Sequence, residues 1–120
     1  MDFTDLLAYK KAYDLSMQIF ELSKKFPTEE RYSLTDQVRR SSRSVCANIS
    51  ESYRKRRYPL HFISKLTDAD AENSETQNWL HFALSCKYIE KDTHTTLLEL
   101  SKEVGSLLNF MMNNPEKFGK

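Results

Sequence analysis

One segment, residues 34–57, constrains the fold more than any other part of this chain. It contains no glycine or proline, and its apolar residues recur at spacings of three and four, the period of an α-helix with one buried face. That face comprises Leu34, Val38, Ser42, Val45, Ile49 and Tyr53. The opposite face has its own regular row, consisting of Arg40, Arg43, Ala47, Ser50 and Arg54. We therefore expect one side of this helix to pack in a core and the other side to contact a partner.

The rest of the chain has the pattern of further helices joined by short connections. Helical spacing predicts four helices, at about 4–26, 33–57, 59–87 and 92–113. Thr4, Ser33 and Asp92 are the expected N-caps, and Pro59 fits the first turn of the third helix. Short connections make consecutive helices antiparallel neighbours. The sequence thus predicts an all-α fold, a single domain over residues 1–120 that forms an antiparallel up-down-up-down four-helix bundle.

The first helix has more apolar surface than one bundle core requires. Its main row comprises Ala8, Ala12, Leu15, Ile19, Leu22 and Phe26. A second row beside it comprises Leu6, Tyr9, Tyr13, Met17 and Phe20. So wide an apolar arc fits a deeply buried helix and equally a helix shared between the core and a subunit interface. The sequence leaves both interpretations open.

The third and fourth helices have less regular apolar faces. The inner face of the third helix comprises Phe62, Leu66, Ala69, Asn73, Leu80 and Leu84. The stripe of the fourth comprises Leu97, Leu100, Val104, Leu107 and Met111. A turn near residue 58 should bring Glu51 of the second helix close to Lys65 of the third. Residues 116–120 are expected to form a frayed tail.

No arrangement of residues typical of a catalytic or metal site is present. His61, His81 and His94 share no ligand spacing with one another or with Cys46 and Cys86. The E-x-x-H pairs of di-iron bundles are absent, and the 2 glycines cannot build a phosphate-binding loop. We therefore expect no enzyme activity, no metal and no cofactor.

The cysteines and the N-terminus bear on the location of the protein. On antiparallel helices, Cys46 and Cys86 would lie too far apart for a disulfide. The start, MDFTDLL, lacks the basic region of a signal peptide, and no apolar run approaches the roughly 20 residues of a membrane span. A reduced, cytoplasmic protein that does not enter the membrane is the expectation.

Charge is unevenly distributed along the chain. The net charge is +1, yet residues 1–60 carry 12 Lys and Arg against 8 Asp and Glu, whereas residues 61–120 carry 6 against 9. The second helix ends in four basic residues, Arg54, Lys55, Arg56 and Arg57. Such a cluster complements the negative end of the helix dipole, and it can also bind nucleic-acid phosphates. These four residues are the candidate nucleic-acid-binding site.

A row on the third helix is a candidate subunit interface. The row begins with the acidic residues Asp68, Glu72 and Glu75 and continues with the aromatic residues Trp79 and Phe82. Large aromatic residues on an outer face indicate a partner. This row and the Arg40 and Arg43 row both face away from the core, so we expect them to meet between copies of the chain. Different patches that meet head to tail form a ring when the rotation closes.

Two segments are specific enough to indicate a family. They are Phe26-Pro27-x-Glu-Glu-Arg31-Tyr32-x-Leu34-Thr35-x-Gln37-x-Arg39-Arg40 and Asn48-Ile49-x-Glu51. With them, the chain resembles the 23S rRNA intervening-sequence protein family of bacterial four-helix bundles. One departure is Lys87, where a Gly-Tyr-Ile turn usually begins. The resemblance implies a homopentameric barrel of antiparallel bundles without known catalysis. Relatives include the accessory variability protein of diversity-generating retroelements, a more basic pentamer that binds nucleic acid and a reverse transcriptase.

Two hypotheses about function follow from these features. The first is a non-enzymatic homo-oligomer, a pentamer by resemblance, that acts as an accessory RNA- or DNA-binding protein through basic clusters repeated around the ring. The second is a scaffold that binds another protein and does not bind nucleic acid. An enzyme whose site forms only between subunits is a third and weaker hypothesis.

Overall fold

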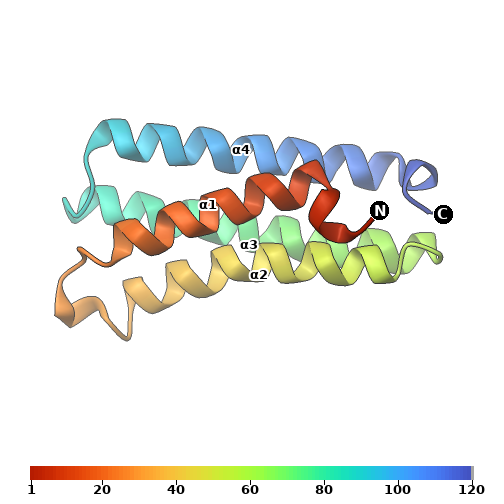
Figure 1. Cartoon of the computed structure of the whole chain (residues 1–120). Coiled ribbons are helices and arrows are strands. Elements are labelled where there is room, and N and C mark those ends of the chain that lie inside the picture. The colour runs from red at the N-terminus through yellow and green to blue at the C-terminus, as the bar shows by residue number, and fades with distance from the viewer. Residues whose placement is uncertain (120) are drawn as a thin grey trace.

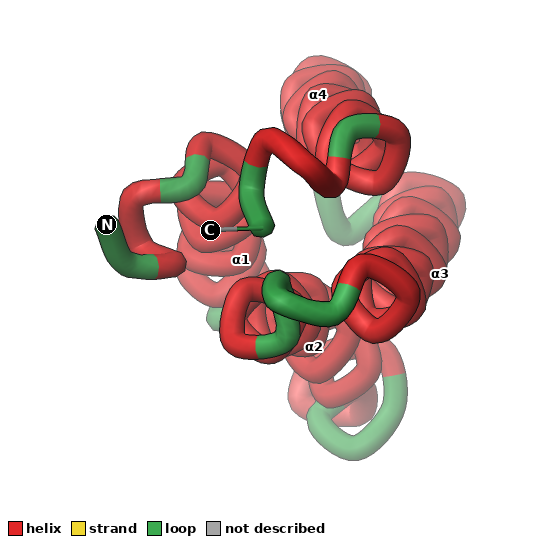
Figure 2. The backbone as a smooth tube through the Cα atoms, turned by 90° about the vertical axis from the view of Figure 1, so that its right-hand side faces the viewer, coloured by secondary structure: helices red, strands yellow, loops and turns green. Residues whose placement is uncertain are grey.

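The computed structural model describes residues 1–119. The described chain has four α-helices and no strand: α1 (Leu7–Ser23), α2 (Leu34–Arg54), α3 (Pro59–Ser85) and α4 (Lys91–Asn113). Three short 3-10 helices, η1 (Phe3–Asp5), η2 (Thr28–Glu30) and η3 (Pro115–Lys117), lie outside them. The helices lie along one long axis (Figure 1), and a view along that axis places them at four corners (Figure 2). The predicted all-α class is confirmed.

The register between α2 and α3 is set by two contacts. The Ser41 and Thr76 hydroxyls lie 2.8 Å apart near one end of the pair. Toward the other end, the Lys65 ammonium lies 2.7 Å from the Glu51 carboxylate, which confirms the predicted proximity of these residues. Because residue numbers rise along α2 as they fall along α3, the two helices run in opposite directions.

The buried face of α4 differs from the predicted stripe. The structure buries Ser101 and Leu108, whereas Leu100 and Leu107 are only half-buried. Ser101 turns inward because its hydroxyl donates to the Asn73 side-chain oxygen at 2.8 Å, and the Asn73 amide donates to the Ser101 carbonyl at 2.9 Å. A satisfied polar pair therefore occupies a core position where the sequence pattern indicated leucine.

The inner faces of α3 and α1 also depart in part from the predictions. On α3, Thr76 and Ala83 are buried, while Leu84 is half-buried. The second apolar row of α1 is divided: Leu6 is buried and Tyr9 packs against the core, whereas Tyr13 is 52% and Met17 42% exposed. Apolar surface on α1 is thus left uncovered within this chain.

The start of the first helix differs from the prediction. Thr4 does not cap it: the N-cap of α1 is Leu6, which has no side-chain cap, and Asp2 caps η1 instead, where its carboxylate accepts the Phe3 backbone N–H at 2.8 Å. Residues 3–5 form η1, and α1 begins only at Leu7. The helix ends at Ser23, since residues 24–26 form turns instead of a last helical turn.

The second and fourth helices are also capped differently from the prediction. The Ser33 hydroxyl accepts no backbone N–H at the start of α2. It donates to the Glu30 carboxylate at 2.6 Å, and the same carboxylate oxygen accepts the Leu34 N–H at 3.2 Å. Asp92 lies within the first turn of α4, which begins one residue earlier, at Lys91. The η2 turn positions Glu30 for its two contacts with Ser33 and Leu34.

The turn after α3 has the hydrogen-bond pattern of a helix C-terminal motif. The Tyr88 N–H donates to the Ala83 carbonyl and the Lys87 N–H to the Leu84 carbonyl, both at 2.9 Å, as in a Schellman motif. Lys87 has a φ of 64°, in the left-handed region that glycine adopts without strain. Lysine therefore occupies a position that favours glycine.

The C-terminal residues fold back onto the bundle instead of fraying as predicted. After η3, the half-buried Phe118 ring lies 6.0 Å from the Phe62 ring and 6.3 Å from the Phe110 ring. Burial of this aromatic side chain offsets the cost of ordering the tail. The part of the prediction that concerns residue 120 lies outside the described residues.

Candidate functional site

The basic cluster lies where α2 turns into α3. α2 ends at Arg54, three residues earlier than predicted, and residues 55–58 form a tight turn in which the Tyr58 N–H donates to the Lys55 carbonyl at 2.9 Å. Pro59 then occupies the first turn of α3, as predicted. The turn leaves Arg54, Lys55 and Arg57 exposed at one end of the bundle.

Arg56 has a different role from its three basic neighbours. It is half-buried, and its guanidinium lies 4.0 Å from the centre of the Tyr53 ring. The same group donates to the Tyr53 carbonyl at 2.8 Å. Arg56 therefore holds the turn onto the end of α2, and the predicted group of four divides into one structural and three exposed residues.

A hollow of about 230 Å³ opens beside this turn. Its lining comprises Arg54, Arg56, Arg57, Tyr58 and Gly119. The Tyr58 ring is 58% exposed and meets the His61 ring edge-on at 6.0 Å. Sequence reasoning missed Tyr58, although an aromatic residue directly after four basic residues was a usable signal. It also missed Gly119, because the tail was expected to fray.

In the described part of the chain, the exposed basic residues of this end form no ion pair with an acidic side chain. Within residues 1–119, the ion pairs involve Lys11, Lys24 and Lys65, and none involves Arg54, Lys55 or Arg57. The carbonyl end of α2 adds a partial negative charge that stabilises the cations but leaves their outer faces in water. The hollow is thus a positively charged recess with an aromatic wall.

The predicted interface residues of α2 lie on its outer face. Arg40 and Arg43 are both exposed. The Arg43 guanidinium lies 5.5 Å from the centre of the Phe20 ring of α1. The Arg39 guanidinium lies 4.9 Å from the centre of the same ring. Within the described chain, no ion pair joins these arginines to Glu72 or Glu75. The structure therefore does not bring the two predicted rows together in one chain.

The acidic part of the α3 row forms a continuous surface. Asp68, Glu72 and Glu75 line one open hollow of about 410 Å³ together with Asn48 and Ala71. Asp68 and Glu75 are exposed, and Glu72 is half-buried. Asp68 also lies 3.5 Å from Lys65, so two of the three acids remain outside any ion pair within residues 1–119.

The aromatic part of the row divides between the core and the surface. Trp79 is half-buried and packs against the core beside Leu22 and Phe26, while its indole N–H donates to Glu75 at 3.3 Å. Phe82 is 51% exposed, and its ring lies 5.8 Å from that of Trp79. Because Trp79 packs against the core of its own chain, Phe82 is the aromatic residue of this row that is more available to contact another copy.

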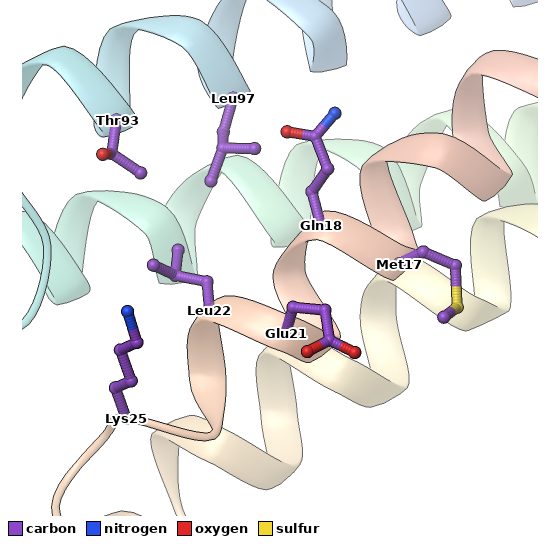
Figure 3. Close-up of a pocket in the computed structure, with 7 residues that line it drawn as sticks. All are labelled: Met17, Gln18, Glu21, Leu22, Lys25, Thr93 and Leu97. Carbon is purple, nitrogen blue, oxygen red and sulfur yellow. The ribbon is translucent and has the colours of Figure 1, made fainter.

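A further open hollow of about 570 Å³ lies between α1 and α4. In Figure 3, Leu22 and Leu97 extend toward each other across it, and the side chain of Met17 points away from α4. Glu21 and Lys25 also belong to its lining. The mixture of single charges and aliphatic groups provides no convergent set of polar groups for a small ligand.

The Cys46 thiol offers little nucleophilic reactivity. Both cysteines are free, and burial raises the pKa of the Cys46 thiol to about 11. Since the thiolate is the reactive form, Cys46 stays protonated at neutral pH. No group of three or more His, Cys, Asp and Glu side chains gathers around a metal position within residues 1–119. None of the helices in that range is both long and apolar enough to cross a membrane.

Comparison with known proteins identifies a family and a similar fold. The model of the family described as 23S rRNA-intervening sequence protein matches residues 4–110. A crystal structure from Bacteroides thetaiotaomicron, described as a protein of unknown function from the S23 ribosomal protein family, superposes with a TM-score of 0.79. It is 26% identical, and the match covers 89% of this chain and 96% of that chain. No curated protein matches this chain.

Proposed function

This chain belongs to the 23S rRNA-intervening sequence protein family, and from the geometry of its basic end we propose that it is a non-enzymatic nucleic-acid-binding protein. In this proposal it is an antiparallel up-down-up-down bundle that assembles into a closed homo-oligomer in the cytoplasm, with five copies favoured by family resemblance. Arg54, Lys55 and Arg57 bind the phosphates.

The observation that carries the proposal is the hollow lined by Arg54, Arg57 and Tyr58. A guanidinium presents several N–H donors in a plane that matches two phosphate oxygens, which makes arginine a strong phosphate ligand. An exposed tyrosine ring beside such groups offers a face on which an unpaired base can stack. This combination of cations and an aromatic wall favours single-stranded RNA or DNA as the ligand.

Binding of this kind does not depend on the base sequence. Phosphate contacts fix the position of a strand but carry no sequence information, and stacking on tyrosine accepts any base. Since Arg56 is held by Tyr53, three basic residues per chain remain for phosphates. Assembly repeats these residues around one rim, and several linked sites bind one strand far more tightly than a single site does.

Assembly is proposed to join the α3 row of one copy to the α2 face of the next. The row offers acidic side chains and the exposed Phe82 ring, while the α2 face offers Arg40 and the Arg43–Phe20 surface. Opposite charges fix the register of such an interface, and a partly buried aromatic ring provides its apolar contact. The two surfaces differ, so the arrangement is head to tail.

The double change Arg54→Ala, Arg57→Ala tests the proposal. We expect it to weaken binding of a fluorescein-labelled single-stranded RNA of mixed sequence at least about tenfold at low salt, because a hydrogen bond to a charged group contributes about 1.5–3 kcal/mol. Fluorescence anisotropy gives the dissociation constants, and sedimentation confirms that the oligomeric state is unchanged.

The matched control is Lys25→Ala, Lys91→Ala, which removes the same charge from exposed residues elsewhere on the bundle. This variant should bind RNA nearly as tightly as the wild type. Equal weakening in both double variants would mean that only net charge matters and that the hollow is not the site. If the wild type binds no RNA at all, the protein-scaffold hypothesis becomes the better one.

A further inference from the structure

A histidine pair joins α3 to α4 near the turn that connects them. His81 Nδ1 lies 3.0 Å from His94 Nε2, and the two ring centres are 5.1 Å apart. His81 belongs to the last two turns of α3, and His94 to the first turn of α4. The chain reverses direction between them at one end of the bundle (Figure 1). The spacing in the sequence resembles no metal motif, so only the fold brings these imidazoles together.

The separation of the two nitrogens suits two ligands of one metal ion. Zinc–nitrogen bonds in proteins are about 2.0–2.1 Å long. Two such bonds at a right angle place their nitrogens about 2.9 Å apart, and at the tetrahedral angle about 3.3 Å apart. The observed distance of 3.0 Å falls at the lower end of that range. A small rotation of the rings would direct both lone pairs at one cation.

The chemistry of the pair also suits a metal. Imidazole nitrogens are common ligands of transition-metal cations. The pair is accessible from solvent, because His81 is exposed and His94 is half-buried. A cation can therefore replace the proton that the two nitrogens share.

We propose that His81 and His94 form a two-histidine site for a transition-metal cation of the Ni²⁺, Cu²⁺ or Zn²⁺ class, which links α3 to α4. Imidazole suits these ions, and Cu²⁺ is expected to bind most tightly of the three. Within residues 1–119 no third side-chain ligand gathers at a metal position. Water completes the coordination, so the site binds reversibly and is not a closed structural zinc site.

The test is thermal unfolding of the full chain with NiCl₂ at pH 7.5. A cation at ten times its dissociation constant favours the folded state by a factor of about 11. For a chain of this length, such a factor raises Tm by roughly 5 °C. The rise should disappear in His81→Ala and in His94→Ala. It should persist in His61→Ala, which removes the third histidine of the chain and is the matched control.

A spectroscopic measurement keeps the test independent of stability. The EPR spectrum of one equivalent of Cu²⁺ should show nitrogen coupling in the wild type and in His61→Ala, and this coupling should be reduced in both single variants of the pair. A Tm rise and nitrogen coupling that survive in His81→Ala and His94→Ala would overturn the proposal, as would the absence of both in the wild type. Since the histidine pair contributes nothing to the proposed phosphate site, neither result depends on RNA binding.

Discussion

Reversal of two charges on α3, by Glu72→Arg and Glu75→Arg, is expected to convert the oligomer into monomers. In the proposed interface these carboxylates face Arg40 and Arg43 of the next copy. The change replaces attraction with like-charge contacts, which cost several kcal/mol at an interface. The fold should be retained, because neither carboxylate forms an ion pair within residues 1–119 and the bond that Glu75 accepts from the Trp79 indole is a long, exposed one at 3.3 Å. Sedimentation velocity and circular dichroism report the two properties separately.

A reciprocal variant makes this prediction specific. Arg40→Glu, Arg43→Glu should also give monomers, and the chain carrying all four changes should assemble again because the attraction is restored with opposite signs. Reversal of the exposed acids Glu99 and Glu116 to arginine provides the control for net charge, and it should leave the oligomer intact. If each pair of changes leaves assembly unaffected, the α2 and α3 rows are not the interface. A wild-type monomer at micromolar concentration would exclude the whole arrangement.

Replacement of Phe62 by alanine is expected to lower the free energy of unfolding by about 3–5 kcal/mol. Phe62 is 0% exposed and is the largest fully buried side chain, and it also supports the Phe118 ring of the folded-back tail. Its loss leaves a cavity and frees the tail. Urea unfolding followed by circular dichroism measures the change.

Leu60 provides the control for this prediction, because it lies two residues earlier on α3 and is 82% exposed. Leu60→Ala should change the free energy of unfolding by less than about 0.5 kcal/mol. A loss in Phe62→Ala as small as that in Leu60→Ala would show that this end of the bundle is not packed as described.

The parts of the fold that follow from local periodicity could be predicted from the sequence. The buried face of α2 agrees with the predicted one at Leu34, Val38, Val45, Ile49 and Tyr53. The spacing of apolar residues along one helix suffices to place them, because a helix fixes which side chains share a face. The Glu51–Lys65 contact followed from a single short turn, whose length determines the register of the helices that it joins.

The errors arise where contacts between distant residues override the local pattern. Ser101 is buried because Asn73, on another helix, satisfies its hydroxyl, and no local spacing records that bond. The tail is ordered because the Phe118 ring packs against the Phe62 ring. The histidine pair has the same origin, since His81 and His94 meet only through the path of the α3–α4 turn. Long-range pairs of this kind require the fold to be known first.

The same limit applied to the basic cluster. Four consecutive basic residues look equivalent in a sequence, but the turn directs Arg56 onto the Tyr53 ring and leaves Arg54 and Arg57 beside Tyr58. The location of the cluster was predictable, because it follows from where α2 ends. Which of the four residues packs against the protein and which remain exposed depends on the geometry of the turn, and the composition of the segment does not specify that geometry.

The salt dependence of nucleic-acid binding by the wild-type oligomer tests the central claim most directly. The logarithm of the association constant for single-stranded RNA should fall linearly with the logarithm of salt concentration, with a slope of about −0.7 for each phosphate contact. RNAs of different sequence should give the same line, because phosphates are not read for sequence. A slope near zero, or no detectable binding at about 50 mM salt by an intact oligomer, would contradict the account.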